Sequence, residues 1–138
     1  MSRLNLLFIL LFSFSNFSVL AQDNKVEEAL QDYLEFEATY SDGAMTAQQI
    51  QNDLDKFFIV DTRNTNSYQQ SHLPKAINIE WRQILNHVDQ LPKEKTILLY
   101  CDTGYLSSKA HFALRLMGFD NVKVLFGGYN MWQTLEKK

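Results

Sequence analysis

The sequence predicts an α/β domain built around a mostly parallel sheet. Short apolar runs alternate with segments of helical periodicity, and polar or turn-forming residues bound each run. Within each run the apolar residues are consecutive and do not alternate with polar ones, which is typical of strands that are buried on both faces of a parallel sheet. The 138 residues are enough for one such domain but hardly for two.

The first helix is expected from Asn24 to Phe36, where apolar residues recur at helical spacing and acidic residues occupy the outer side. Asp42-Gly43 is a turn signal within the loop that follows, from Tyr40 to Ala44. Thr46, with Gln49 three residues later, predicts a capping box that opens a second helix. The apolar stripe of this second helix consists of Ala47, Ile50, Leu54 and Phe57.

Four apolar runs predict strands, and helices are expected between them. The strands are expected at Phe57–Val60, Ala76–Ile79, Thr96–Tyr100 and Val122–Phe126. The helices are expected at Asn64–Ser71, at Trp81–Leu91, from near Ser107 to Met117, and at Tyr129–Glu136. The core is expected to include Trp81, Trp132 and the inner face of the helix that ends at Met117, marked by Ala110, Ala113, Leu114 and Met117. The helix surfaces are expected to carry His87 and His111.

Residues 1–21 have the layout of a secretory signal peptide. A basic start at Arg3 is followed by an apolar stretch from Leu4 to Phe12 and by Val19-Leu20-Ala21. An uncleaved membrane anchor is the alternative, but it needs roughly 20 mostly apolar residues, and polar residues interrupt this stretch. We expect cleavage after Ala21, export to the periplasm or the medium, and no stable membrane span after cleavage. Residues 22–44 then form an N-terminal helical extension, and residues 45–138 form the domain.

Composition excludes several classes of function. The formal charge is −3 and no basic face is visible, so nucleic-acid binding is not expected. The single cysteine, Cys101, cannot form an internal disulfide, and an odd cysteine in an exported protein is either an intermolecular partner or a free reactive thiol. The three histidines have no ligand spacing, so we expect no metal.

Cys101 lies where a predicted strand ends and a turn leads into a helix. Open parallel sheets bind ligands beyond the carboxyl ends of their strands. A helix start exposes N–H groups and a positive dipole end, which stabilise an anion and lower the pKa of a thiol. Gly104 lets the loop bend so that several amides point inward. Free cysteine is also common in cores, so position alone leaves a nucleophile and a core residue equally open.

Four segments, in order and at matching spacing, resemble the rhodanese (sulfurtransferase) domain family over residues 45–138. They are 58-FIVDTR-63, 71-SHLPKAINI-79, 97-ILLYCDTGYLSS-108, with the Cys-x-x-Gly active loop, and 125-LFGGYNMW-132. The resemblance implies a rhodanese-like α/β fold with a parallel five-stranded sheet flanked by helices on both faces. The chain resembles a single-domain, exported member of this family.

The resemblance implies a sulfurtransferase that works through a persulfide on Cys101. The thiolate would take the outer sulfur from a small sulfur donor and pass it to a thiol or cyanide acceptor, without a cofactor. The loop that would bind the substrate and the persulfide consists of Asp102, Thr103, Gly104, Tyr105, Leu106 and Ser107.

Three further residues are expected to support this loop. Asp61 and Arg63 are expected to form a charge-assisted pair that braces the strand ends, rather than a solvated surface pair. His72 is expected to make a structural hydrogen bond before Pro74 rather than to line the site.

Two loop positions indicate a donor other than thiosulfate. Many members of the family carry an arginine at the last loop position or basic residues just after the cysteine, whereas this chain has Leu106 and Asp102 there. An acid beside the thiolate opposes the lowering of the thiol pKa and repels anionic donors. Lys109 offsets part of this effect.

Three other functions fit the residues less well. A phosphatase of this fold needs an arginine six positions after the cysteine, and Ser107 stands there. A thioredoxin-like oxidoreductase needs a second cysteine at the position of Gly104. The third is a catalytically weak binding or regulatory module. Its protein partner could be recruited by the helix at 24–36.

Overall fold

The computed structural model describes residues 24–35 and 43–136. The predicted signal peptide and its cleavage site lie outside the described residues, as does Phe36. The chain divides into two compact units, Met1–Glu37 and Ala38–Lys138. In the first unit, residues 24–35 form the expected helix. Within the described ranges, no helix is long and apolar enough to cross a membrane.

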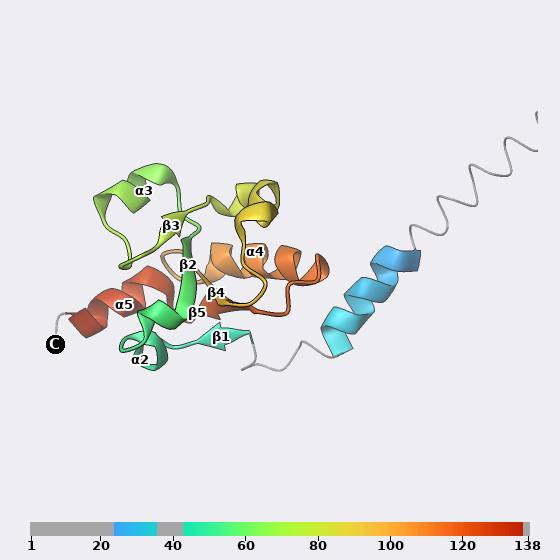
Figure 1. Cartoon of the computed structure of the whole chain (residues 1–138), viewed down its shortest axis with the longest axis horizontal. Coiled ribbons are helices and arrows are strands. Elements are labelled where there is room, and N and C mark those ends of the chain that lie inside the picture. Colours follow the sequence, from blue (N-terminus) through green and yellow to red (C-terminus); the bar gives the residue numbers. More distant parts are fainter. Residues whose placement is uncertain (1–23, 36–42, 137–138) are drawn as a thin grey trace, which may run out of the picture. The chain divides into compact units, whose positions relative to one another are not determined.

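The second unit is built on a five-stranded parallel sheet in the order β1-β5-β4-β2-β3 (Figure 1). The strands are β1 (Ala44–Met45), β2 (Phe57–Asp61), β3 (Ile77–Asn78), β4 (Thr96–Tyr100) and β5 (Val122–Leu125). Four of them lie in the predicted apolar runs, and the predicted fold class is confirmed.

The fifth strand, β1, was not predicted from the residues and lies where a loop was expected. Two residues are too few to show a period. The strand exists because the edge of β5 offers it partners: Val124 N–H donates to the Gly43 carbonyl at 2.7 Å, and Phe126 N–H donates to the Met45 carbonyl at 2.8 Å. Tertiary pairing therefore decides this element.

The helices of this unit are α2 (Ala47–Ile50), η1 (Leu54–Lys56), α3 (Thr65–Gln70), η2 (Trp81–Gln90), α4 (Tyr105–Leu116) and α5 (Gly128–Glu136). The predicted capping box is present, since the Thr46 hydroxyl oxygen accepts from Gln49 N–H at 3.3 Å and the Gln49 side chain accepts from Thr46 N–H at 2.7 Å.

Three helices differ from their predicted form. The second helix ends at Ile50, because the non-helical backbone at Asp53 starts a separate 3-10 turn. The segment Trp81–Gln90 is a 3-10 helix with non-helical backbone at His87. The helix predicted from near Ser107, which is α4, begins at Tyr105, because Gly104 turns the chain within a single residue at φ 95°.

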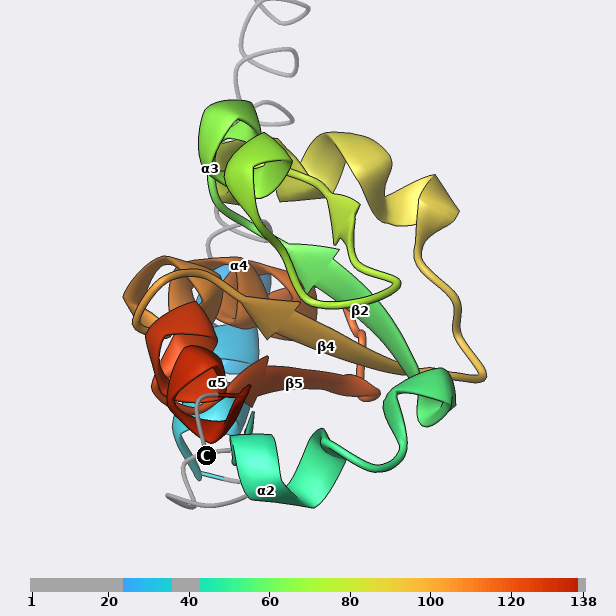
Figure 2. The ribbon, with the colours of Figure 1, turned by 90° about the vertical axis from the view of Figure 1, so that its left-hand side faces the viewer.

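Helices cover both faces of the sheet, and two core clusters fill the space between the layers. In Figure 1, α2 and α5 lie to the left of β2 and α4 lies to its right, while Figure 2 shows β2, β4 and β5 side by side. One face packs Ile59, Leu98 and Tyr100 of the strands against Ala47, Ile50, Tyr129 and Trp132. The other face packs Val60, Ile97 and Leu99 against Ile84, Ala110 and Leu114.

His111 of α4 and Met117, the residue after this helix, lie differently from their predicted positions. His111 is buried rather than on the surface, and its ring lies against Gly43, which precedes β1. Its burial could not be predicted, because Gly43 is far from it in the sequence. Met117 is exposed rather than inward-facing, because α4 ends at Leu116.

The start of α5 lies directly on the loop that follows β4. Tyr129 N–H donates to the Cys101 carbonyl at 2.8 Å, and Asn130 N–H donates to the Asp102 carbonyl at 3.0 Å. Gly128 has φ 58°, and a Cβ built on it would lie 2.7 Å from the carbonyl carbon of Asp102. Only glycine allows this close approach of two backbones.

Gly128→Ala is expected to lower the free energy of unfolding through both backbone strain and overlap with the loop. Gly118→Ala is the matched control, because Gly118 also has positive φ, at 80°, but nothing lies within 4 Å of its built Cβ. Overpacking costs about 1–3 kcal/mol, so Gly128→Ala is expected to lose that much more than the control in urea unfolding. Equal losses would mean that the approach of α5 to the loop does not constrain this position.

Candidate active site

The parallel register of β2 and β4 brings two polar segments together at one edge of the sheet. Asp61 pairs with Tyr100 in this register, so the residues that follow each strand leave the sheet next to each other. Thr62 donates to the Tyr100 carbonyl twice, from its N–H at 2.8 Å and from its hydroxyl at 2.9 Å. The segment after β2 is thereby tied to the start of the cysteine loop.

Cys101 lies at the bottom of a tight loop, with its side chain facing the start of α4. The residue is 2% exposed, and its Sγ accepts a hydrogen bond from Gly104 N–H at 3.2 Å. The Ser107 hydroxyl oxygen lies 3.8 Å from Sγ and 2.9 Å from the Gly104 carbonyl oxygen, so its single proton can be donated to either of them. A Cβ built on Gly104 would lie 3.4 Å from the Leu125 carbonyl oxygen, so the loop also touches the end of β5.

The environment of Cys101 favours its thiolate. Burial alone raises the pKa of a thiol because it removes water from the anion. Here hydrogen bonds outweigh burial: the backbone amides of Ser107, Thr103 and Leu106, together with the Ser107 hydroxyl, lower the pKa of Cys101 below its ordinary value. The amides at the start of α4 therefore stabilise the thiolate, as a basic side chain does in other thiol sites.

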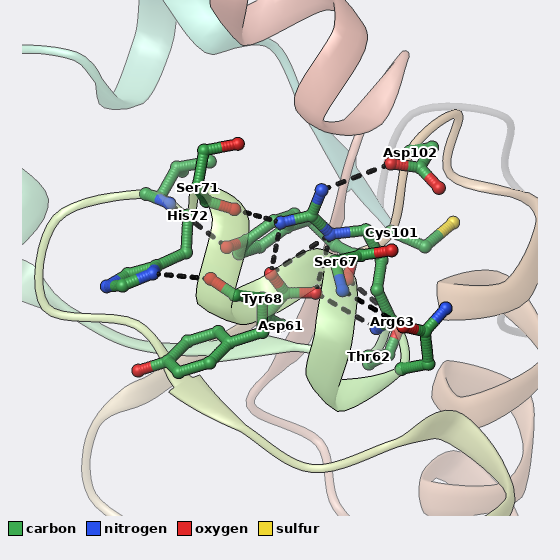
Figure 3. Close-up of polar contacts among 12 residues, drawn as sticks. Asp61, Thr62, Arg63, Ser67, Tyr68, Ser71, His72, Cys101 and Asp102 are labelled. Carbon is green, nitrogen blue, oxygen red and sulfur yellow. Dashed lines mark hydrogen bonds and ion pairs between the residues drawn. The ribbon is translucent and has the colours of Figure 1, made fainter.

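Arg63 connects three segments around this loop (Figure 3). Its Nε lies 3.0 and 3.1 Å from the two carboxylate oxygens of Asp61, and its Nη2 lies 2.6 Å from Asp61 Oδ2. The guanidinium also donates to the Ser71 carbonyl at 2.6 Å and to Asp102 Oδ1 at 3.2 Å. Its carbon lies 4.4 Å from the centre of the Tyr129 ring. Asp61 and Arg63 are both buried, so they form a buried pair and not a surface one.

Of the remaining predicted loop residues, three are exposed and one is half-buried. Asp102 and Tyr105 are exposed, and the Asp102 carboxylate is paired with Arg63 rather than unopposed beside the thiolate. Thr103 is exposed, and its hydroxyl oxygen lies 3.5 Å from the Tyr105 amide nitrogen. Leu106 is half-buried in the first turn of α4.

His72 does not join the cysteine loop. The residue is exposed, its Nδ1 lies 2.8 Å from the Tyr68 carbonyl, and its ring stacks on the Tyr68 ring at 4.1 Å. Figure 3 shows it on the far side of the Asp61–Arg63 pair from Cys101. Its contacts are the local ones expected before Pro74.

Sequence reasoning missed three residues that hold the site together: Thr62, Tyr100 and Tyr129. The hydroxyl of Tyr100 accepts from Leu73 N–H at 3.0 Å, and burial raises the pKa of this phenol. Tyr100 and Tyr129 resemble ordinary core aromatics in the sequence. Only the position of the Arg63 guanidinium, which lies over both rings, distinguishes them.

Comparison with known families matches residues 45–135 to the rhodanese-like domain. This match covers more than half of the chain. The chain belongs to the rhodanese-like domain family. Among the described residues of this rhodanese-like chain, no three His, Cys, Asp or Glu side chains gather into a metal site.

Two relatives connect this rhodanese-like chain to sulfur transfer. It is 31% identical over 76 residues to the thiosulfate sulfurtransferase GlpE of Coxiella burnetii, which covers 55% of this chain and 71% of the relative. It is 31% identical over 118 residues to the tRNA sulfurtransferase of Aeromonas hydrophila, which covers 75% of this chain and 24% of the relative. The chain therefore belongs to a family with sulfurtransferase activity.

Solved structures share the fold. The rhodanese-related protein of Thermoplasma volcanium superposes with a TM-score of 0.63 at 20% identity, over 67% of this chain and 91% of that one. The BH2092 protein of Bacillus halodurans superposes with a TM-score of 0.62 at 26% identity, over 80% of this chain and 82% of that one.

Arg63→Gln is expected to be strongly destabilising, because it leaves the carboxylate of Asp61 buried without its cation. Breaking a buried pair from one side costs about 3–5 kcal/mol. The Asp61→Asn/Arg63→Gln double variant removes both charges and is expected to lose clearly less than the sum of the two single variants. Urea unfolding of the unmodified protein, of Asp61→Asn, of Arg63→Gln and of the double variant measures this coupling. Additive losses would contradict a pair that acts as one unit.

Alkylation of Cys101 by iodoacetamide is expected to show a pH midpoint below the ordinary thiol value of about 8.5. Ser107→Ala removes a hydroxyl that stabilises the thiolate. A net hydrogen bond contributes about 1 kcal/mol, so the midpoint is expected to rise by up to about 0.7 pH unit.

Ser108→Ala is the matched control, because the Ser108 hydroxyl also donates to the Gly104 carbonyl, at 2.8 Å, as the Ser107 hydroxyl does. The midpoint of Ser108→Ala is expected to stay near that of the unmodified protein. Equal midpoints for both serine variants would show that the Ser107 hydroxyl has no direct effect on the thiolate. Cys101 is the only cysteine of the chain, so total alkylation reports on it alone.

Proposed function

We propose that this protein is a sulfurtransferase that carries a sulfane sulfur as a persulfide on Cys101. The observation that carries the proposal is the cysteine Sγ at the start of α4, where loop amides lower its pKa. A thiolate is the nucleophile in sulfur chemistry, and a lowered pKa raises its concentration at neutral pH.

The reaction needs no side-chain base. The thiolate of Cys101 attacks the outer sulfur of a donor, a bond forms between Sγ and that sulfur, and the electron pair of the broken bond leaves with the rest of the donor. A thiol or cyanide acceptor then attacks the terminal sulfur and restores the thiolate. Each step exchanges one anion for another, so the N–H groups of the loop stabilise the thiolate and the persulfide alike.

The charges around the loop support a donor other than thiosulfate. Asp102 is the residue next to Cys101, and its carboxylate offsets positive charge of Arg63 that would otherwise attract an anion. Arg63 is committed to Asp61, Ser71 and Asp102, so it adds little attraction for a dianion. Polysulfides and organic persulfides are the donors proposed here. The leader-like residues 1–21 support export, with the donor and the acceptor met in the periplasm or the medium.

The purified mature protein, residues 22–138, is expected to gain the mass of one sulfur atom on incubation with polysulfide, and to lose it again on addition of cyanide. Intact-protein mass spectrometry measures both steps. Cys101→Ser is expected to gain nothing.

Two outcomes would overturn the proposal: no added sulfur on the unmodified protein, or added sulfur retained in Cys101→Ser. The first outcome would favour the alternative function, a binding or regulatory module that keeps the fold without the chemistry.

A further inference from the structure

Asp102, the residue directly after Cys101, is held from two directions. Its carboxylate Oδ1 accepts from Arg63 Nη1 at 3.2 Å, and Figure 3 shows this contact. Its carbonyl accepts from Asn130 N–H at 3.0 Å, beside the bond from Tyr129 N–H to the Cys101 carbonyl at 2.8 Å. The backbone of Asp102 is therefore fixed by the start of α5, and its side chain is fixed by the segment after β2.

Arg63 is a rigid partner for this carboxylate. Its guanidinium makes three contacts of 2.6–3.1 Å with Asp61, donates to the Ser71 carbonyl at 2.6 Å, and lies 4.4 Å from the centre of the Tyr129 ring. An ion pair at a protein surface contributes little, because two mobile side chains must be ordered to form it. Here the side chain of Arg63 is 6% exposed and already ordered, so only the side chain of Asp102 has to be immobilised.

The orientation of Asp102 matters because the donors to the cysteine sulfur follow it in the chain. The N–H group of Gly104 donates to Cys101 Sγ at 3.2 Å. Burial raises the pKa of the thiol, and loop amides, that of Thr103 among them, lower it by more. A hydrogen bond weakens steeply when its angle departs from linear. The direction in which the chain leaves Asp102 therefore affects how well these amides point at the sulfur.

We propose that Asp102 is a positioning residue for Cys101: its contact with Arg63 fixes the start of the loop, so that the loop N–H groups point at Sγ. The inference rests on the proposed function, since it assigns a role in the same site to the residue beside the cysteine. The carboxylate acts on the sulfur through the orientation of the loop, and this effect is opposite in sign to that of its charge. A negative charge disfavours a thiolate nearby, whereas well-aimed N–H groups favour it.

Two substitutions separate position from charge. Asp102→Ala and Asp102→Asn both remove the negative charge, but only Asn keeps an oxygen that accepts from Arg63 Nη1. The side chain of Asp102 is 57% exposed, so neither substitution opens a cavity in the core. The difference between these two variants therefore reports on the contact with Arg63 and not on the charge.

The experiment measures the pH midpoint of alkylation of Cys101 by iodoacetamide in both variants and in the unmodified protein. The midpoint of Asp102→Asn is expected to lie at or below that of the unmodified protein. The midpoint of Asp102→Ala is expected to lie about 0.5–1 pH unit above that of Asp102→Asn, because hydrogen bonds to the thiolate are weakened. At a pH below both midpoints, sulfur uptake from polysulfide is expected to be at least about twofold slower in Asp102→Ala, since it has less thiolate.

Asp120→Ala is the matched control. Asp120 is likewise an exposed acid that pairs with a largely buried arginine, since its Oδ1 lies 3.5 Å from Nη1 of Arg115. It follows the other end of α4 from the cysteine loop. The alkylation midpoint and the sulfur uptake of this variant are expected to equal those of the unmodified protein.

Each result decides the inference. Equal midpoints for Asp102→Ala and Asp102→Asn would overturn it, as would a lower midpoint for Asp102→Ala, because charge alone would then explain the effect of Asp102. Equal sulfur uptake by the two variants would overturn the role in the reaction. Failure of the proposed function looks different: the unmodified protein would gain no sulfur from polysulfide, whatever its alkylation midpoint.

Discussion

The buried ion pair between Asp61 and Arg63 is the interaction on which the arrangement of the active-site loops depends. From the end of β2, the guanidinium reaches the Ser71 carbonyl before β3 and the Asp102 carboxylate after β4. Two charges removed from water must satisfy each other. A displacement of the segment before β3 or of the loop after β4 would break a hydrogen bond to the guanidinium that the pair holds in place, so the pair favours one arrangement of the loops.

The backbone, rather than side chains, supplies the polar groups around Cys101. Amides at the start of α4 face the sulfur, while amides at the start of α5 hold the carbonyls of Cys101 and Asp102 on the other side. Helix geometry places these groups whatever the side chains are.

Much of the fold could be predicted because it rests on local patterns. The residues of β2 and β4 are apolar on both faces of the sheet, because helices cover both faces and bury the side chains there. The position of Cys101 at a strand end followed from the same pattern. β1 could not be predicted, because its two residues become a strand only by pairing with β5. The burial of His111 beside Gly43 could not be predicted either, because these two residues are far apart in the sequence.

The sequence by itself determined the fold class, the family, the cysteine as the reactive candidate and the pairing of Asp61 with Arg63. Each of these features depends on residues that are close together in the sequence. Only the tertiary structure decided that Arg63 also holds Asp102 and that Gly128 brings α5 onto the loop. Each of these contacts joins residues from different strand ends, and the register of a parallel sheet, not the spacing along the chain, brings them together.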